Sequence, residues 1–351
     1  RDDIHAVVGP AYSNHMDRMA TLLESSHKVL ISPWATSADI ARNYAGKDFF
    51  WSLVESDITQ CEMLISRAIY YGAKKLSLIT TSNTYGNTFN DWFPFQGHEM
   101  GVEIGDVYIY DGGMSDLRTM TRTALTDGSD AIICVPSRIE DAIEMIRLRD
   151  AMEGNPPLLL FSDVAHNETL LTLGKQADYI EGLTPYIAPE TGFSIAYKAK
   201  FGSAPSSLEG QLYDAFLILF HAFTALDINA AETLNDAIKY VVSSTEPDGT
   251  KRTPVSCWQY EALYRQLHNI RNGKNLYDIG GATGDLNFNI SMQSSVLRTT
   301  YVHWMAYNNR FISLDYLTSD GSRRTEGTMP SWNWNVENIQ SFNNTQEFTY
   351  G

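Results

Sequence analysis

Polar and aromatic side chains follow four apolar runs of this sequence, each at the point where a predicted strand ends. The four stretches read V-G-P-A-Y-S, I-S-P-W-A-T-S, T-T-S-N-T-Y-G-N and L-L-L-F-S-D-V, and they supply Tyr12, Ser13, Trp34, Ala35, Thr36, Tyr85 and Asp163. Open α/β sheets bind their ligands at the carboxyl ends of the strands. Hydroxyl-bearing loops suit a carboxylate, aromatic rings suit the walls of a pocket, and the acid suits an ammonium group. The set predicts a pocket for a small zwitterion.

Each of these residues also has a structural interpretation. Ser13 and Thr36 are of types that cap helices, and Asp163 has the right type and place to cap the helix that follows it. Trp34 and Tyr85 are typical packing residues. For any single residue the two interpretations are balanced, and the shared position at strand ends favours binding.

The sequence lacks the usual signatures of catalysis. It contains no G-x-S-x-G elbow, no G-x-x-x-x-G-K-[ST] loop, no H-E-x-x-H and no acidic calcium loop. The histidines are scattered, and we interpret His15, His98, His166 and His221 as surface or helix-face residues. The glycine-rich segment 280–284 could cradle a phosphate, but it lacks the lysine and the strand-then-helix setting of a nucleotide loop, so a plain turn is the better interpretation.

Composition excludes several classes of protein. The 351 residues suit two domains, and 43% apolar against 19% charged residues is typical of a folded chain. A formal net charge of −16 repels phosphate backbones, so we expect no nucleic-acid partner. No apolar run approaches the roughly 18 residues of a membrane span. Cys61, Cys134 and Cys257 lie far apart, which predicts buried thiols and no zinc site, and we expect no cofactor.

Strand-like and helix-like segments alternate along the first half of the chain, as in a doubly wound α/β fold. Expected strands cover 4–10, 28–33, 74–81, 102–110, 130–136, 156–163 and 301–307, and expected helices cover 16–26, 60–72, 87–100, 115–125, 139–152, 167–177, 193–202, 209–226 and 260–273. Asn167 is the predicted cap of the helix over 167–177. The aromatic, amide-rich tail 331–351 shows little periodicity.

With these residues in order, the sequence resembles the type I periplasmic binding proteins, in particular the Leu/Ile/Val-binding branch. The resemblance runs from about residue 3 to residue 315. It rests on D-D-I-H-A-V-V-G-P, L-I-S-P-W-A-T-S, S-D-I-T-Q, G-A-K-K-L-S-L-I-T-T-S-N-T-Y-G, S-D-A-I-I-C, P-L-L-L-F-S-D, E-G-Q-L-Y-D-A and R-N-G-K-N-L-Y-D-I-G-G-A-T-G-D-L-N-F. Each motif is loose alone, and their order and spacing together are specific.

The resemblance implies a set of ligand contacts. Ser13, Thr36 and the backbone of Trp34 correspond to the first-lobe loops that hold the ligand's carboxylate and amine. Tyr85 corresponds to the second-lobe tyrosine, and Asp163 stands where the branch has a longer glutamate for the amino group. Ser137 and Arg138 follow C-V-P, where some relatives have tyrosine, and Trp34 and Tyr12 replace smaller residues. The side-chain pocket is therefore expected to differ from that of the branched-chain amino-acid binders.

The resemblance also implies two Rossmann-like lobes joined by a three-strand hinge that closes on the ligand. Residues 1–55 and 188–291 would form the first lobe, and 56–187 and 292–351 the second, with crossings near residues 56, 187 and 292. The family's first two β–α units, roughly 60 residues at about 30 per unit, have no counterpart before Arg1. We therefore expect a first lobe that is shortened at its N-terminal side.

The expected function is capture of a small amino-acid-like solute in the periplasm or cell envelope for an ABC-type permease or a receptor, with a lipid anchor as one form of attachment. Three alternatives remain open. The fold could serve a ligand sensor, an amide or amino-acid enzyme with Asp163 or His166 as general base, or a degenerate interaction domain with an occluded cleft.

Overall fold

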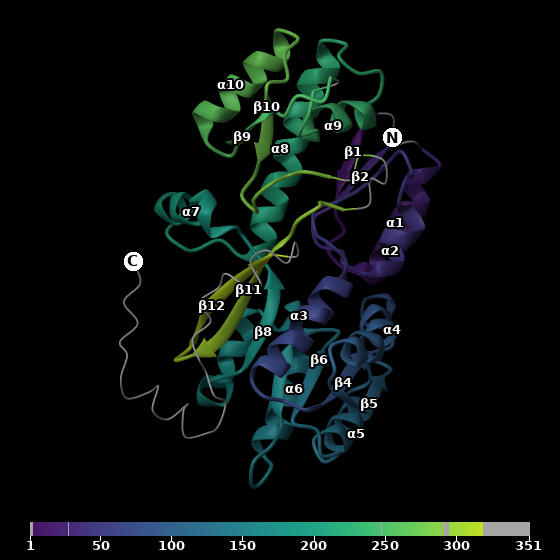
Figure 1. The fold of residues 1–351 in the computed structure, drawn as a ribbon, viewed down its shortest axis with the longest axis vertical. Helices are drawn as coiled ribbons and strands as arrows, with labels where there is room; N and C mark the ends of the chain where they lie inside the picture. Colours follow the sequence, from purple (N-terminus) through teal and green to yellow (C-terminus); the bar gives the residue numbers. More distant parts are fainter. Residues whose placement is uncertain (1–2, 27, 247, 289, 291–294, 319–351) are drawn as a thin grey trace.

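The structure, a computed structural model, describes residues 3–26, 28–246, 248–288, 290 and 295–318. The tail 331–351 and the predicted crossing at residue 292 lie outside these ranges. The described chain forms two α/β lobes, each built on its own sheet (Figure 1). The prediction of a two-lobed, doubly wound α/β fold is confirmed.

The first lobe contains a three-stranded parallel sheet. Its strands, in spatial order, are β1 (Ala6–Val8), β2 (Val29–Ser32) and β3 (Phe50–Ser52). Successive residues of a strand point to opposite faces, and in β2 both faces are buried: Leu30 packs with α1 (Ser13–Glu24) and α2 (Ala38–Tyr44), whereas Ile31 packs with α8 (Ser207–Asp227) and α9 (Leu234–Val242). A parallel pair, β9 (Thr253–Ser256) and β10 (Tyr277–Gly280), lies beside α10 (Tyr260–Arg271) at the far end of this lobe.

The second lobe contains a seven-stranded sheet in the order β12-β11-β8-β7-β6-β4-β5. Its parallel strands are β4 (Lys75–Thr81), β5 (Glu103–Tyr110), β6 (Ala131–Val135), β7 (Leu158–Phe161) and β8 (Glu181–Pro185), and an antiparallel hairpin of β11 (Thr300–Tyr307) and β12 (Arg310–Thr318) adds the edge. The strand order reverses between β4 and β6, which is the point where such sheets bind ligands.

Two helical layers cover this sheet. Alternate residues of its strands divide between them, so that Leu78 and Ile133 pack toward α3 (Asp57–Tyr70) and α4 (Thr84–Glu99), and Ile79 and Cys134 pack toward α5 (Met114–Ala124) and α6 (Ile139–Asp150). The near-continuous apolar strands of the sequence follow from this two-sided burial.

Three chain segments join the lobes, and hydrogen bonds tie them together. Glu55 N–H donates to Thr299 Oγ1, and Thr299 N–H donates to Glu55 Oε2, each at 2.9 Å. Tyr186 N–H donates to the carbonyl of Thr300 at 2.7 Å. From there the chain continues through the short 3₁₀ turn η3 (Pro189–Thr191) into α7 (Phe193–Phe201). The joint is therefore one hydrogen-bonded unit. The lobe bounds themselves stay a prediction, and the part of the second lobe over 319–351 lies outside the described residues.

One predicted helix differs from the structure in its type. The helix expected over 167–177 is a 3₁₀ segment, η2 (Glu168–Ala177), which is interrupted at Gly174, where φ is 59° and ψ is −127°. The Asn167 side chain does cap it, accepting the N–H of Thr169 at 2.9 Å. The segment 280–284 is a turn, as the better interpretation held, because the N–H groups of Ala282 and Thr283 donate to the carboxylate of Asp214 and not outward.

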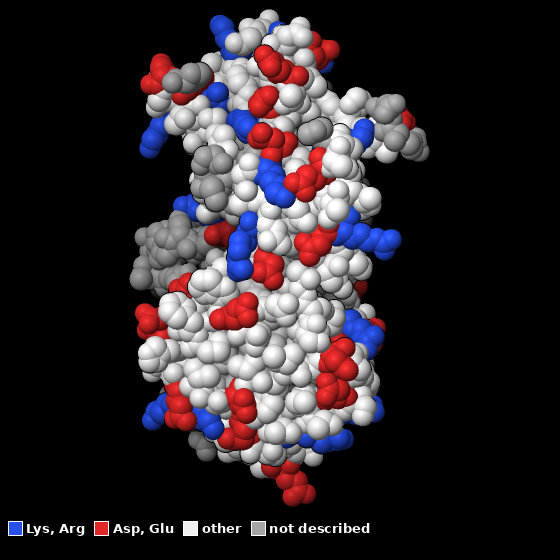
Figure 2. Space-filling view, turned by 90° about the vertical axis from the view of Figure 1, so that its right-hand side faces the viewer, with Lys and Arg blue, Asp and Glu red and all other residues white. Residues whose placement is uncertain are grey.

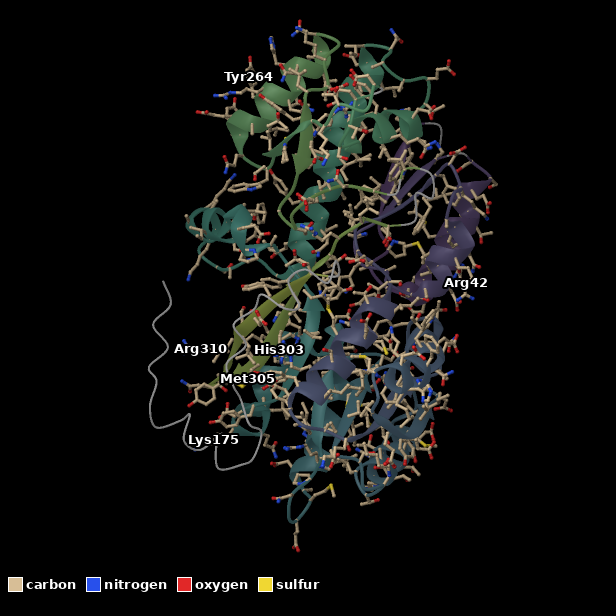
Figure 3. All side chains as sticks on the ribbon, viewed as in Figure 1. Arg42, Lys175, Tyr264, His303, Met305 and Arg310 are labelled. Atoms are coloured by element: carbon tan, nitrogen blue, oxygen red, sulfur yellow. The ribbon has the colours of Figure 1, made fainter. Side chains whose placement is uncertain are left out.

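In the described part of the chain, no helix has both the length and the apolarity needed to cross a membrane. The face shown in Figure 2 carries acidic and basic side chains intermixed over both lobes, without a large field of basic residues. Figure 3 shows His303 and Met305 on β11, within the sheet of the second lobe. His303 is buried, and its Nε2 lies 2.6 Å from Glu181 Oε2 on the neighbouring strand β8.

Candidate functional site

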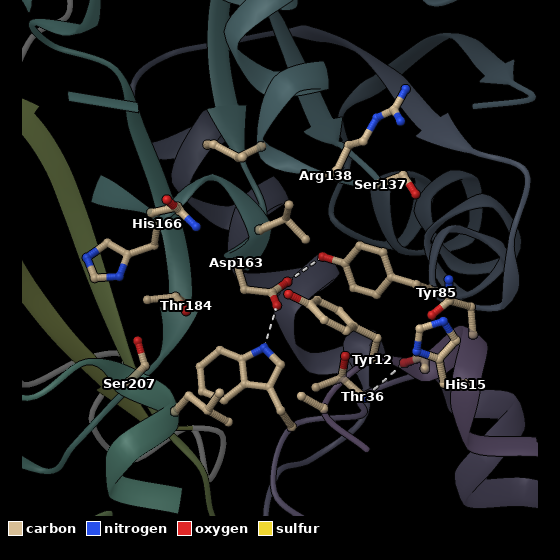
Figure 4. A pocket seen from close by; sticks show the side chains of 18 of the residues that line it. Tyr12, His15, Thr36, Tyr85, Ser137, Arg138, Asp163, His166, Thr184 and Ser207 are labelled. Atoms are coloured by element: carbon tan, nitrogen blue, oxygen red, sulfur yellow. Dashed lines mark hydrogen bonds between the residues drawn. The ribbon is translucent and has the colours of Figure 1, made fainter. Parts of the chain in front are cut away.

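A cavity of about 510 Å³ lies between the lobes, at the carboxyl ends of strands from both sheets (Figure 4). Seven of the eight predicted site residues line it: Tyr12, Ser13, Trp34, Thr36, Tyr85, Ser137 and Asp163. Ala35 does not line it. Its side chain is buried in the core of the first lobe, and its N–H donates to Ser32 Oγ at 3.1 Å.

The first lobe contributes two loops to the cavity, one after β1 and one after β2, and Ser13 links them to each other. Ser13 is the first residue of α1, and its Oγ accepts the N–H groups of Thr36 and Ser37, both at 3.2 Å. The cap interpretation of the sequence is wrong for Ser13 and Thr36, because Tyr12 precedes α1 without a side-chain cap bond and Ser37 caps α2. The two loops are thus fixed against each other at the cavity floor.

The second lobe contributes Asp163, which is 7% exposed and begins the short 3₁₀ turn η1 (Asp163–Ala165) after β7. Its Oδ1 accepts a short hydrogen bond from the hydroxyl of Tyr85, and its Oδ2 accepts the indole N–H of Trp34 at 2.9 Å. Burial raises the pKa of Asp163, and the hydrogen bonds from Tyr85 and Trp34 partly offset this. A buried acid with two neutral donors is thus aimed into the cavity.

Tyr85 reaches Asp163 because α4 begins earlier than the sequence predicts. The helix starts at Thr84, and the Asn83 side chain caps it by accepting the N–H groups of Tyr85 and Gly86 at 3.0 and 3.1 Å. Tyr85 is therefore a buried residue of the first helical turn, whereas the predicted helix over 87–100 left it before the helix. Burial and the nearby charge of Asp163 raise the pKa of its hydroxyl well above the usual value, so the hydroxyl stays a donor.

Asp57 is a buried acid that our sequence reasoning did not assign to the site. It is the first residue of α3 and 1% exposed. Its N–H donates to the carbonyl of Thr36 at 2.7 Å, and its Oδ2 accepts the Thr36 hydroxyl at 2.8 Å. Burial and the charge of Asp163 raise its pKa well above the usual value. The S-D start of α3 was the available signal, and it has the pattern of an ordinary helix start.

Two histidines line the cavity, which their interpretation as surface or helix-face residues did not anticipate. His15 lies in the first turn of α1. His166 follows η1 and packs against Phe311 with ring centroids 4.3 Å apart, and burial lowers its pKa to about 4. His166 is therefore a neutral wall of the cavity at physiological pH.

The other side of the cavity is polar. Ser137 accepts a hydrogen bond from the Asn83 amide at 3.1 Å, and Arg138 beside it pairs with Asp141 at 3.0 Å. Thr184 at the end of β8 and Ser207 at the start of α8 also line the cavity, and sequence reasoning missed both. Among the residues that the structure describes, no group of three or more His, Cys, Asp or Glu side chains could hold a metal ion.

The comparisons agree with this geometry. The model of a periplasmic binding protein family matches residues 1–253, and no curated protein sequence matches the chain. A leucine-binding protein of Thermotoga maritima shares the fold with a TM-score of 0.68 and 18% identity, over 90% of this chain and 81% of that one. A branched-chain amino-acid transporter substrate-binding protein of Streptococcus pneumoniae, in complex with isoleucine, has a TM-score of 0.66 and 18% identity. The match covers 90% of this chain and 80% of that one.

A solute-binding protein of R. palustris in complex with 4-hydroxybenzoate gives a TM-score of 0.68 at 11% identity, over 96% of this chain and 82% of that one. At these identities the likeness to solved structures shows the fold, whereas the family model covers most of the sequence. Membership of the matched family implies a place outside the cytoplasm. The chain therefore belongs to the periplasmic binding proteins.

Proposed function

We propose that this protein captures a small amino-acid-like ligand in the cavity between its lobes and delivers it to an ABC-type permease. The observation that carries the proposal is Asp163, an acid buried at the cavity whose two hydrogen-bonding side chains, Trp34 and Tyr85, are both neutral. Leaving an ionised carboxylate buried beside neutral donors costs free energy, and a ligand's ammonium group would recover it.

Two further features support this ligand class. The first turn of α1 borders the cavity, and helix N-termini favour a carboxylate there. Tyr12, Trp34 and His166 supply flat walls that suit an apolar or aromatic side group on the ligand. Among the similar solved proteins are a leucine-binding protein, a complex with isoleucine and a complex with 4-hydroxybenzoate, and these ligands bracket the proposed range of side groups.

The ligand class is tested by a thermal-shift screen against the twenty amino acids and against benzoate and 4-hydroxybenzoate, followed by calorimetry on each hit. Binding to the folded state alone must raise the unfolding midpoint by mass action. For an amino-acid hit, Asp163→Asn should weaken affinity more than tenfold, since a charge-assisted hydrogen bond contributes about 1.5–3 kcal/mol.

The matched control is Asp91→Asn, an exposed acid on α4 that lies outside the cavity, and its affinity should equal that of the wild type. A screen in which only the carboxylates without an amino group bind would contradict the proposal. So would an amino-acid hit that Asp163→Asn binds equally well.

Delivery to a permease is the second part of the proposal, and it places the protein in the periplasm or on the cell envelope, with a lipid anchor as one means of attachment. In this picture the lobes are 1–55 with 188–291 and 56–187 with 292–351, and they close on the ligand as rigid units. Deletion of the gene should abolish uptake of the radiolabelled hit into cells. Unchanged uptake with a lost transcriptional or chemotactic response to the same ligand would show a sensor instead.

A further inference from the structure

Three polar side chains line the cavity on the opposite side of Asp163 from Tyr85. Figure 4 shows them there: His166, Thr184 and Ser207. Thr184 lies in β8 of the second lobe and is 1% exposed, whereas Ser207 begins α8 of the first lobe and is 5% exposed. We call His166, Thr184 and Ser207 together the neutral subsite.

The side chains of the neutral subsite keep unused hydrogen-bonding capacity. Within the described residues, the Ser207 hydroxyl and the His166 ring form no hydrogen bond, and the Thr184 hydroxyl donates to the carbonyl of Pro185 at a long 3.4 Å. Burial lowers the pKa of His166 to about 4, so its ring is neutral at physiological pH and has one N–H donor and one acceptor nitrogen. Hydroxyls likewise both donate and accept. The neutral subsite thus offers donors and acceptors without a charge.

The charged side chains of the cavity lie elsewhere. Among the described residues that line it, Arg138 and Glu140 are the only Lys, Arg, Asp or Glu side chains besides Asp163. Arg138 precedes α6 and Glu140 lies in its first turn, and Figure 4 shows Arg138 on the side of Tyr85. A charged group of a ligand in the neutral subsite would therefore be desolvated without a counter-charge, which is costly.

An apolar group would also fit the neutral subsite poorly. It would cover the buried hydroxyls of Thr184 and Ser207 and leave them without a partner, and an unsatisfied buried polar group costs free energy. A group that is uncharged, and that can both donate and accept, avoids both costs. Hydroxyl and carboxamide groups have these properties.

We propose that the neutral subsite selects ligands whose side group ends in an uncharged hydroxyl or carboxamide. With the amino group of the ligand at Asp163, this polar end bonds to Thr184 and Ser207, while the aromatic walls of the cavity cover the apolar part of the side group. The inference rests on the proposed function and narrows its ligand class. Tyrosine, threonine, asparagine and glutamine are favoured over the amino acids of similar shape that lack such an end.

The test is calorimetry on the full chain with pairs of amino acids of similar shape. Tyrosine is compared with phenylalanine, threonine with valine, asparagine with leucine, and glutamine with glutamate. A site built to bond a polar group of its ligand discriminates strongly against the analogue that lacks this group. The tightest ligand should have the neutral polar end, and its affinity should exceed that of its counterpart more than about tenfold.

Ser207→Ala and Thr184→Val each remove one hydroxyl with little change in volume. Each should weaken binding of the polar ligand about three- to tenfold and change binding of its counterpart much less, so the ratio of the two affinities falls. Thr121→Val is the matched control, because it removes a buried hydroxyl on α5 outside the cavity and should keep both affinities. The unfolding midpoint of each variant, read by circular dichroism, checks the fold, and Ser207→Ala alone decides the test if Thr184→Val does not fold.

A tightest ligand without a neutral polar end, such as leucine or glutamate, overturns the inference, although capture of an amino acid then stands. An affinity ratio in Ser207→Ala equal to that of the wild type also overturns it. If no amino acid binds, the proposed function fails and the inference fails with it. Binding of any amino acid therefore distinguishes failure of the subsite from failure of the proposed function.

Discussion

At the scale of single residues, the joint between the lobes depends on one buried acid. Asp214 lies on α8 with 0% exposure, and its carboxylate accepts the N–H groups of Ala282 and Thr283 at 2.6 and 2.9 Å and the Thr283 hydroxyl at 2.7 Å. A Cβ at Gly281 would overlap this carboxylate, so the glycine is needed for close approach. Asp214 therefore anchors the segment that returns from the first lobe to the second.

This acid makes stability depend on pH. Burial raises the pKa of Asp214 to about 6, against a value of 3.8 when unfolded. The folded state thus binds the proton more tightly. The contribution of Asp214 to the free energy of unfolding is therefore full below pH 3.8 and is lost as pH rises through 6. Between pH 5 and pH 8 the free energy of unfolding should fall by about 1.4 kcal/mol more in the wild type than in Asp214→Asn.

Urea unfolding of both proteins at the two pH values measures this difference. The Asn variant is expected to be less stable at either pH, because one amide oxygen cannot replace a carboxylate with three donors. Parallel pH profiles for the two proteins would show that Asp214 does not titrate in this range.

Seven of the residues that line the cavity could be predicted from the sequence because they share one signal, a polar or aromatic side chain after an apolar strand. Asp57, Thr184 and Ser207 lack that signal. Asp57 is the first residue of α3, after a segment that joins the lobes, and Ser207 is the first residue of α8. Only the folded chain brings Ser207 to the cavity and Asp57 to Thr36 at its edge, so both positions depend on tertiary structure.

At the scale of elements, the start of α4 decides where Tyr85 lies. Gly86 occupies its first turn, and a Cβ there would lie 2.6 Å from Thr80 Oγ1 and would overlap the carbonyl of Thr81. The glycine thus allows the helix to begin against the end of β4. Without this close approach Tyr85 would not reach Asp163.

Gly86→Ala should therefore push α4 away from the sheet. We expect a loss of about 1–3 kcal/mol in the free energy of unfolding, the usual cost of overpacking, together with weaker binding of any hit from the ligand screen. Gly113→Ala is the matched control, since that glycine precedes α5 after the neighbouring strand and its added Cβ would meet only Asp111 Oδ1, at 3.1 Å. Urea unfolding measures the free energy of unfolding of both variants. Equal losses in Gly86→Ala and Gly113→Ala would show that the close approach of α4 to β4 does not explain the effect.

Strands with a continuous apolar run were predictable, and strands without one were not. The long apolar runs of β4, β6 and β7 stand out in the sequence, whereas β8 reads E-G-L-T-P and includes a buried acid, Glu181, that pairs with His303. The helix expected over 167–177 had suitable spacing, but Gly174 adopts a left-handed φ that ends regular helix. A tertiary hydrogen-bond partner and a backbone break are both invisible to periodicity.

At the scale of the whole molecule, the fold places two sheets with their carboxyl edges facing one cavity. The lobes have separate cores, one on each side of β2 in the first lobe and one on each side of the larger sheet in the second. The connecting segments carry hydrogen bonds among themselves, and Ile187, Phe193 and Ala282 form a small apolar cluster of their own at the joint. A relative motion of the lobes therefore needs no change inside either core, which is the physical condition for a hinge.

The buried cysteines divide between these cores: Cys257 lies in the core of the first lobe, and Cys61 and Cys134 lie in the cores of the second. Each thiol becomes reactive only when the core around it unfolds, so the labelling rate of each cysteine reports the local unfolding of that core. Mass spectrometry of peptides after timed alkylation in mild urea should give one rate for Cys61 and Cys134 and another for Cys257. One labelling rate shared by all three cysteines would mean that the two lobes unfold together as one cooperative unit.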